Sequence, residues 1–150
     1  VEWTTIAFFM ALFVVVGGLT ETGVIKQVAA VIIERTAGHP VMMMLILLWA
    51  SALLSSFLNN IPFIATLIPL VLALKADGMD AEPLWWAISL GACLGGNGTM
   101  IGASANVVLS DISTKHGYPI TFKSYLRVGM PFMLGSVFIS MVFLLVKYAI

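Results

Sequence analysis

The charged side chains of this sequence fall into clusters, and four long runs between them carry no charge. These runs cover residues 3–20, 36–74, 83–110 and 128–146. An α-helix needs about 20 mostly apolar residues to cross the hydrocarbon core of a bilayer. The first and last runs fit one crossing each, the second is too long for one, and the third contains an interruption. The pattern predicts an all-α integral membrane protein.

Composition excludes several classes of function. Only 9% of the residues are charged, whereas an ordinary soluble domain has about 25%. Seven basic and seven acidic side chains cancel, so nothing indicates nucleic acid as a partner. The single cysteine, Cys93, cannot form an intrachain disulfide. The apolar runs contain no nucleophile with a paired base and no carboxylate pair, so we do not expect an enzyme.

The interruption of the third run, residues 91–106, is rich in glycine and uncharged polar residues. Irregular backbone at membrane depth is tolerated only where it is buried in protein or lines a polar cavity. The flanking segments, 83–94 and 104–113, reach about 18 Å and 15 Å at 1.5 Å per residue. Neither spans a core of about 30 Å alone, but end to end they do. The sequence therefore predicts a broken transmembrane helix at 83–114, with its break near the middle of the bilayer, as in secondary transporters.

The second run has two interpretations. An apolar helix from residue 41 ends at Asn59-Asn60-Ile61-Pro62, and another runs to about residue 74. The pair is either two spanning helices joined by a turn in water or a re-entrant hairpin, 41–74, whose tip at 55–62 stops inside the membrane. The second helix reaches only about 21 Å, which is short for a core of about 30 Å and favours the hairpin.

The two ends of the sequence complete the predicted topology. Residues 1–36 are expected to form a membrane helix followed by an amphipathic helix at the interface, and residues 128–147 a final membrane helix. The connector 111–127 is net basic, whereas the loop 75–82 is net acidic. The positive-inside rule therefore places the connector in the cytoplasm.

Polar side chains in the interruption are the first candidates for an ion site. They would cost free energy in hydrocarbon unless they found partners, and they are Asn97, Thr99, Ser104 and Asn106. A broken helix also exposes carbonyls at one end and N–H groups at the other, which attract cations and anions respectively. A structural alternative is close helix packing, which the four-residue spacing of Gly91 with Gly95 and of Gly98 with Gly102 favours.

Several motifs occur along the whole chain in the order of a known family. They are Val16-Gly17-Gly18-Leu19, Thr22-Gly23-Val24-Ile25, Asn60-Ile61-Pro62-Phe63 and residues 95–108. They resemble the arsenite-permease, NhaD-type sodium/proton antiporter and P-protein branch of the ion transporter superfamily, and are most similar to its P-protein-like members. The resemblance implies a fold of two inverted repeats, each with a re-entrant hairpin and a broken helix. It identifies this chain as the C-terminal repeat only.

The same resemblance implies where solutes bind, which is where hairpin tips meet helix breaks. On that analogy the substrate- and ion-binding residues are Ser56, Asn59, Asn60, Asn97, Gly98, Thr99, Ser104 and Asn106. It implies no catalytic residues, no cofactor and no resident metal; the coupling ion is Na⁺ or H⁺, with Na⁺ at Asn59, Asn60 and Asn97. Many relatives carry aspartate where this sequence has Asn59, and an amide cannot titrate. Proton coupling through this position is therefore not expected.

The expected function is ion-coupled secondary transport of a small inorganic ion, either an arsenite-type anion or sodium in exchange for protons, by alternating access. One alternative is a citrate or dicarboxylate carrier of the same superfamily, and another is a non-transporting membrane subunit whose glycines serve only helix packing. The expected partners are the lipid bilayer, the N-terminal repeat of the same polypeptide, a small ion and a second copy in a homodimer. The expected location is the bacterial inner membrane.

Overall fold

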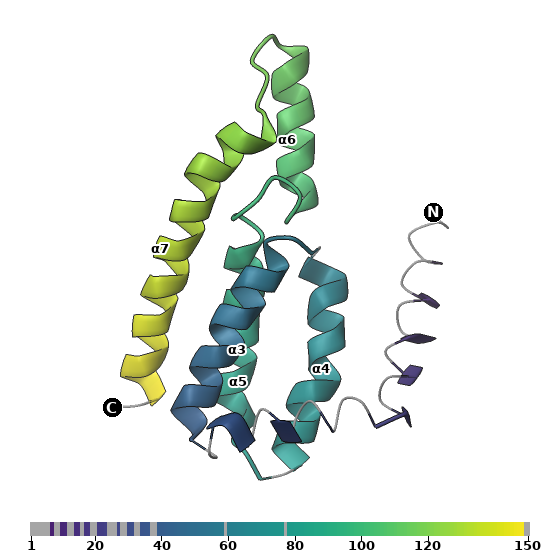
Figure 1. The fold of residues 1–150 in the computed structure, drawn as a ribbon, viewed down its shortest axis with the longest axis vertical. Helices are drawn as coiled ribbons and strands as arrows, with labels where there is room; N and C mark the ends of the chain where they lie inside the picture. The colour runs from purple at the N-terminus through teal and green to yellow at the C-terminus, as the bar shows by residue number, and fades with distance from the viewer. Residues whose placement is uncertain are drawn as a thin grey trace.

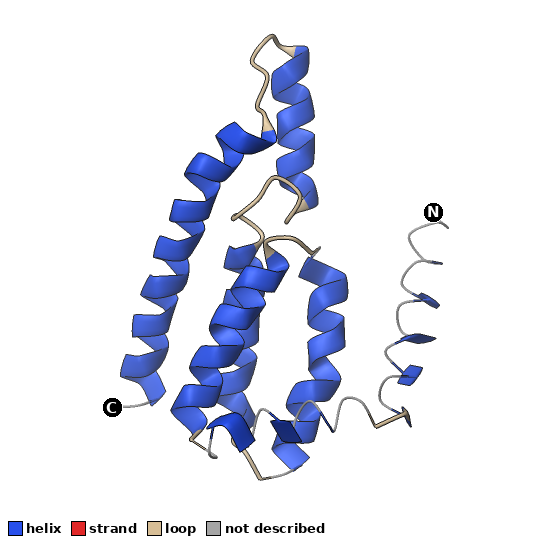
Figure 2. Ribbon diagram, viewed as in Figure 1, coloured by secondary structure: helices blue, strands red, loops and turns tan. Residues whose placement is uncertain are grey.

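The computed structural model describes residues 39–58, 60–76 and 78–148, together with single positions and short runs between Ala7 and Thr36. These parts of the chain contain helices and loops but no strand (Figure 2), as the predicted all-α class requires. The continuous ranges form α3 (Pro40–Ser55), α4 (Asn60–Ala76), α5 (Ala81–Gly95), α6 (Ser104–Lys115) and α7 (Phe122–Tyr148). The helices predicted within residues 1–36 lie largely outside the described residues.

Local sequence explains where α3 and α5 begin. Pro40 opens α3, where its fixed φ suits the first turn and its missing N–H is not needed. Asp80 precedes α5 and its carboxylate accepts a hydrogen bond from the Glu82 backbone N–H at 3.0 Å. This side-chain cap satisfies one of the N–H groups that the first turn leaves without an intrahelical partner.

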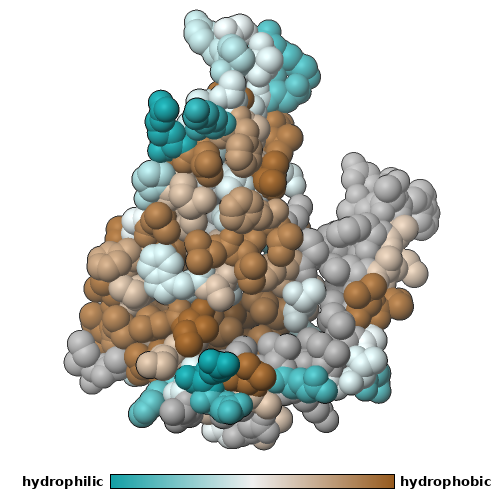
Figure 3. Space-filling view, viewed as in Figure 1, coloured by the Kyte–Doolittle hydropathy of each residue, from teal (hydrophilic) through white to brown (hydrophobic). Residues whose placement is uncertain are grey.

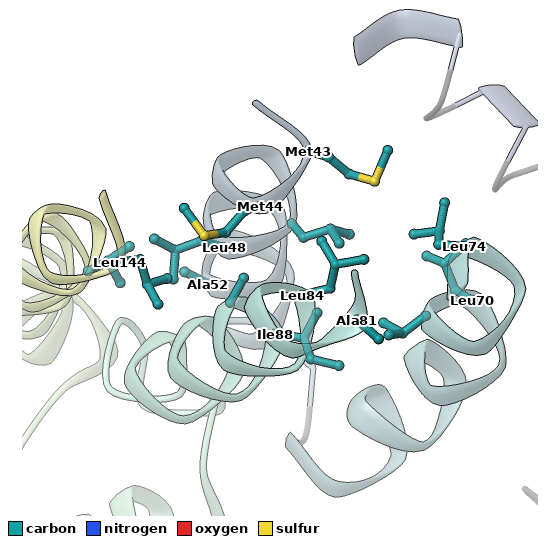
Figure 4. Close-up of a cluster of buried hydrophobic side chains, with 14 of the residues drawn as sticks. Met43, Met44, Leu48, Ala52, Leu70, Leu74, Ala81, Leu84, Ile88 and Leu144 are labelled. Carbon is teal, nitrogen blue, oxygen red and sulfur yellow. The ribbon is translucent and has the colours of Figure 1, made fainter. Parts of the chain in front are cut away.

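Helix α5 lies at the centre of the bundle and contacts α3, α4 and α7 (Figure 1). Figure 4 shows the buried apolar side chains between these helices. Met44 and Leu48 of α3 meet Leu84 and Ile88 of α5, and Leu144 of α7 joins them from the other side. The residues of this cluster are all aliphatic or methionine, so dispersion and close shape matching hold the helices together.

The surface of the molecule carries a broad hydrophobic band. Figure 3 shows apolar side chains over the middle of the view and hydrophilic ones gathered at its upper and lower ends. Among the described helices, α7 is the one long and apolar enough to cross a membrane, and α3 and Phe63–Ala76 are shorter apolar helices. The 27 residues of α7 reach about 40 Å at 1.5 Å per residue. Large exposed apolar side chains on such a band are the pattern of a lipid-facing surface.

Helix α7 begins earlier than the sequence pattern predicted, at Phe122 instead of Val128. A reciprocal cap explains the difference. The Thr121 backbone N–H donates to Ser124 Oγ at 3.0 Å, and the Ser124 backbone N–H donates to Thr121 Oγ1 at 3.2 Å. Such a capping box stabilises the first turn. The positive charges of Lys123 and Arg127 therefore lie on the helix and not in a connector.

Candidate functional site

The turn between α3 and α4 lies against the non-helical segment between α5 and α6. Figure 1 shows both at the same level of the bundle. Asn60 lies so close to Gly96 that a Cβ at Gly96 would be 2.8 Å from Asn60 Nδ2. A Cβ at Gly98 would be 3.0 Å from the Ser56 Cβ. We call this region the junction, formed by Ser55, Ser56 and Asn60 with residues 96–103 and Asn106.

Buried hydroxyl groups tie the two sides of the junction together. Thr99 is fully buried, and its hydroxyl donates to the Ser56 carbonyl oxygen while it accepts from the Gly102 backbone N–H at 3.2 Å. The Ser55 hydroxyl lies 2.8 Å from the Ala92 carbonyl oxygen and is also bonded to the Asn60 amide. A buried polar group left without a partner costs about 1–3 kcal/mol. These bonds therefore favour a single arrangement of the α3–α4 turn against the segment between α5 and α6.

Asn106 stabilises the non-helical segment from within. Its side-chain NH₂ donates to the Gly96 carbonyl oxygen at 2.9 Å and to the Thr99 carbonyl oxygen at 3.2 Å. Interrupting a helix leaves carbonyl groups without intrahelical partners, and this amide supplies the missing donors. Asn106 thus uses both N–H groups to hold the loop closed.

Asn97 is arranged differently. Its side chain is half-buried and makes no hydrogen bond to the described part of the chain. It lies at a groove of about 410 Å³ between the break and α7, lined by Asn97, Ile120, Ser124, Tyr125, Val128, Gly129 and Phe132. We call this the α7 groove. Of the three described asparagines in the junction, Asn97 is the one whose side chain makes no hydrogen bond within the described residues.

The predicted site residues do not all fall in one place. Ser56, Asn60, Asn97, Gly98, Thr99 and Asn106 meet in the junction. Ser104 begins α6 with an exposed side chain, and Asn59 lies outside the described residues. Within the ranges that the structure describes, no group of three His, Cys, Asp or Glu side chains is placed to hold a metal ion.

The two glycine pairs have different roles. A Cβ at Gly91 would lie 2.4 Å from the Leu48 carbonyl oxygen, and one at Gly95 would lie 2.3 Å from the Ala52 carbonyl oxygen. These two glycines allow the backbones of α3 and α5 to touch, which is close helix packing of the predicted kind. Gly102 instead faces the Gly96 and Ser56 carbonyl oxygens at 2.7 Å and 2.8 Å. Because Gly102 has no side chain, the backbone segments of the junction can approach one another this closely.

Comparison with known proteins identifies the family. Residues 1–91 match the citrate transporter family, CitMHS. The chain belongs to this family. Over its full length it is 44% identical to the P protein of Homo sapiens and 39% identical to a 46 kDa membrane protein of Mycobacterium leprae. It is also 41% identical, over 99% of its length, to an uncharacterized transporter of Mycobacterium tuberculosis. It spans 19% of the human protein and 36% and 35% of the two mycobacterial ones. No solved structure matches.

Membership of the citrate transporter family confirms the resemblance to the ion transporter superfamily. The matching family is one of citrate transporters, and the relatives include a membrane protein and an uncharacterized transporter. The solute is a separate question, because the names of these relatives state none.

Sequence reasoning missed three residues of this region. Ser55 belongs to the cluster of serines near the end of α3, but only Ser56 was predicted to be functional. Tyr125 and Gly129 of α7 were not predicted, although a Cβ at Gly129 would lie 2.7 Å from the Asn97 carbonyl oxygen. Gly129 within an apolar helix was the available signal. Its neighbour across the bundle is 32 residues away in sequence, and no local pattern reveals that.

Proposed function

We propose that this chain forms one half of the transport unit of an ion-coupled secondary transporter that moves a small inorganic ion by alternating access. The observation that carries the proposal is the junction, where a hairpin tip and a helix break meet through Asn60, Gly96 and the Thr99 to Ser56 hydrogen bond. Non-helical backbone among membrane helices persists only where protein buries it or where it lines a polar cavity. A site that binds and releases an ion would explain why non-helical backbone is retained at the junction.

The helix ends at the junction suit two ions of opposite charge. The carboxyl end of α5 carries the negative end of its helix dipole, which attracts a cation, and the amino end of α6 presents N–H groups, which attract an anion. The cap residue of α6, Ala103, supplies no side-chain hydrogen bond to those N–H groups. The junction residues include no Asp, Glu or His, so Na⁺ is the coupling ion that we propose at these amide and carbonyl oxygens.

The architecture we propose requires a second repeat. In it, the α3–α4 pair is a re-entrant hairpin and α5 with α6 a broken membrane helix, and a repeat of opposite topology in the same polypeptide faces the junction. The chain spans 36% of the mycobacterial relative of 46 kDa, which leaves room for a repeat of similar size. Each such polypeptide would pair in a homodimer within the bacterial inner membrane.

A citrate or dicarboxylate carrier is the second candidate, favoured by the name of the matching family. Citrate carries several negative charges, and burying them requires cationic groups or many donors. The junction contains no Lys or Arg. In a citrate carrier the other repeat would have to supply those charges.

Flux measurements on the full-length protein in liposomes test these proposals. Gradient-driven uptake of arsenite, chloride or sodium supports the first, and uptake of citrate alone supports the second. If no solute in this panel moves, the transport proposal is wrong. The panel should be run with and without a sodium gradient, since coupling to Na⁺ predicts that the gradient drives uptake.

Asn97→Ala separates transport from a purely structural role of the glycine-rich stretch. Loss of one hydrogen bond to a charged solute costs about 1.5–3 kcal/mol, so we expect flux to fall about 10- to 100-fold with the protein still folded. Ser136→Ala, which removes a helix hydroxyl bonded to the Met133 carbonyl oxygen at 2.9 Å, is the control and should keep normal flux. Normal flux in Asn97→Ala would instead support a role for this stretch in helix packing alone.

A further inference from the structure

The α7 groove combines apolar walls with an available amide. Val128 and Phe132 form part of its walls, and no charged side chain lines it. At its inner side lies Asn97, whose amide has no partner in the described part of the chain. An amide facing lipid tails would cost free energy, so an acyl chain is a poor occupant of this groove. Water or a polar solute satisfies the amide.

The position of the groove along α7 places it at one membrane surface. Arg127 and Lys147 are 20 residues apart on the helix, or about 30 Å, which matches the thickness of a hydrocarbon core. Long cationic side chains near helix ends lie at the interface. The groove extends along this end of the helix, from Ile120 just before α7 to Phe132, and Gly129 beside it faces the Asn97 carbonyl oxygen. One end of the groove therefore lies at the Arg127 side of the membrane.

We infer that the α7 groove is the aqueous entrance through which the transported solute reaches Asn97. The inference rests on the proposed transport function and adds the route and the class of solute to it. Since the positive-inside rule places the Arg127 side in the cytoplasm, this is the cytoplasmic entrance.

The lining of the groove also defines the class of solute. A volume of about 410 Å³ holds a small ion with part of its water shell, since one water takes about 30 Å³. An uncharged lining gives no compensation for a solute with several charges. The groove therefore favours compact solutes that carry few charges or keep their water shell.

Thiol labelling tests whether water fills the groove. Val128 and Ile139 lie on the same helix and are 71% and 70% exposed, but only Val128 lines the groove. In full-length protein lacking other cysteines, including Cys93, we expect a membrane-impermeant thiol reagent to modify Val128→Cys and not Ile139→Cys. Equal, slow labelling of both would mean that lipid or another part of the polypeptide covers the groove, and would overturn the inference. This readout does not depend on transport.

Blocking the groove tests whether the solute uses it. In protein whose wild-type flux has been measured, Val128→Trp should lower the initial rate about tenfold, equivalent to roughly 1.4 kcal/mol added to the barrier, while Ile139→Trp keeps the wild-type rate. Both variants should elute as folded protein in size-exclusion chromatography. Equal rates for the two variants, with wild-type flux intact, would overturn the inference and leave the transport proposal standing. Faster transport of multiply charged than singly charged solutes would overturn the assigned class.

Discussion

Replacing Gly95 by alanine should separate α3 from α5. An added Cβ would lie 2.3 Å from the Ala52 carbonyl oxygen, 2.7 Å from its Cα and 2.9 Å from its carbonyl carbon. All three are backbone atoms, so no side chain can rotate away. Restoring the 3.0 Å that real Cβ atoms require moves one backbone by about 0.7 Å. That shift would also pull Ser55 and Ser56 away from the break.

Two opposing terms set the size of the effect. Overfilling a packed interior by one carbon costs about 1–3 kcal/mol, and a backbone clash belongs at the upper end of that range. Alanine recovers about 1 kcal/mol through its higher helix propensity. We therefore expect a net destabilisation of about 2 kcal/mol, or a thermal midpoint lower by about 4–8 °C.

The measurement is the thermal unfolding midpoint of the purified protein in detergent, followed by tryptophan fluorescence. Gly135→Ala on α7 is the matched control, because a Cβ there meets nothing within 4 Å. This control should keep or slightly raise the midpoint through helix propensity. If Gly95→Ala is as stable as Gly135→Ala, contact between the α3 and α5 backbones does not limit stability and the reasoning is refuted.

Two further substitutions test the hydrogen bonds at opposite ends of the bundle. Thr99→Val keeps the shape of the side chain but leaves the buried Ser56 carbonyl and Gly102 N–H without their partner. We therefore expect about 1–3 kcal/mol of destabilisation in the same assay. Thr99→Ser should retain most of the stability, and equal loss in both variants would count against the role of the hydroxyl. Tyr148→Phe removes the exposed hydrogen bond to Glu82 Oε1 at 2.7 Å, and because exposed polar contacts contribute little, the midpoint should not change. A fall as large as that of Thr99→Val would contradict this.

Local pattern was sufficient for the helices and for the polar residues that the structure brings together at the junction, whose role in binding stays a prediction. Absence of charge over 83–110 and the cluster of glycine at its centre predicted an interrupted helix, and the structure leaves residues 96–103 non-helical between α5 and α6. The Asn-Pro turn predicted the separation of α3 from α4. The charge pattern predicted the start of α7 too late. The helix begins before the two positive charges because a capping box between Thr121 and Ser124 stabilises its first turn.

Roles within the site could not be predicted from residue type. Asn60, Asn97 and Asn106 carry the same side-chain amide. Asn106 donates hydrogen bonds to two carbonyl groups of the loop, Asn60 accepts one from Ser55, and Asn97 faces the α7 groove. Whether an amide is used internally or is available to a solute depends on which backbone groups lie within about 3 Å. That is a property of neighbours that are distant in sequence.

The sequence by itself determined that the chain belongs in a membrane, that its helices are interrupted at two polar points, and which residue types gather there, because hydrophobicity and glycine content act locally along the chain. The resemblance implied that the two points meet, but only the tertiary structure decided which side chains make that contact and that α7 lies beside them. Backbone contact at Gly95 and Gly129 set that arrangement, since it depends on how closely particular helices approach.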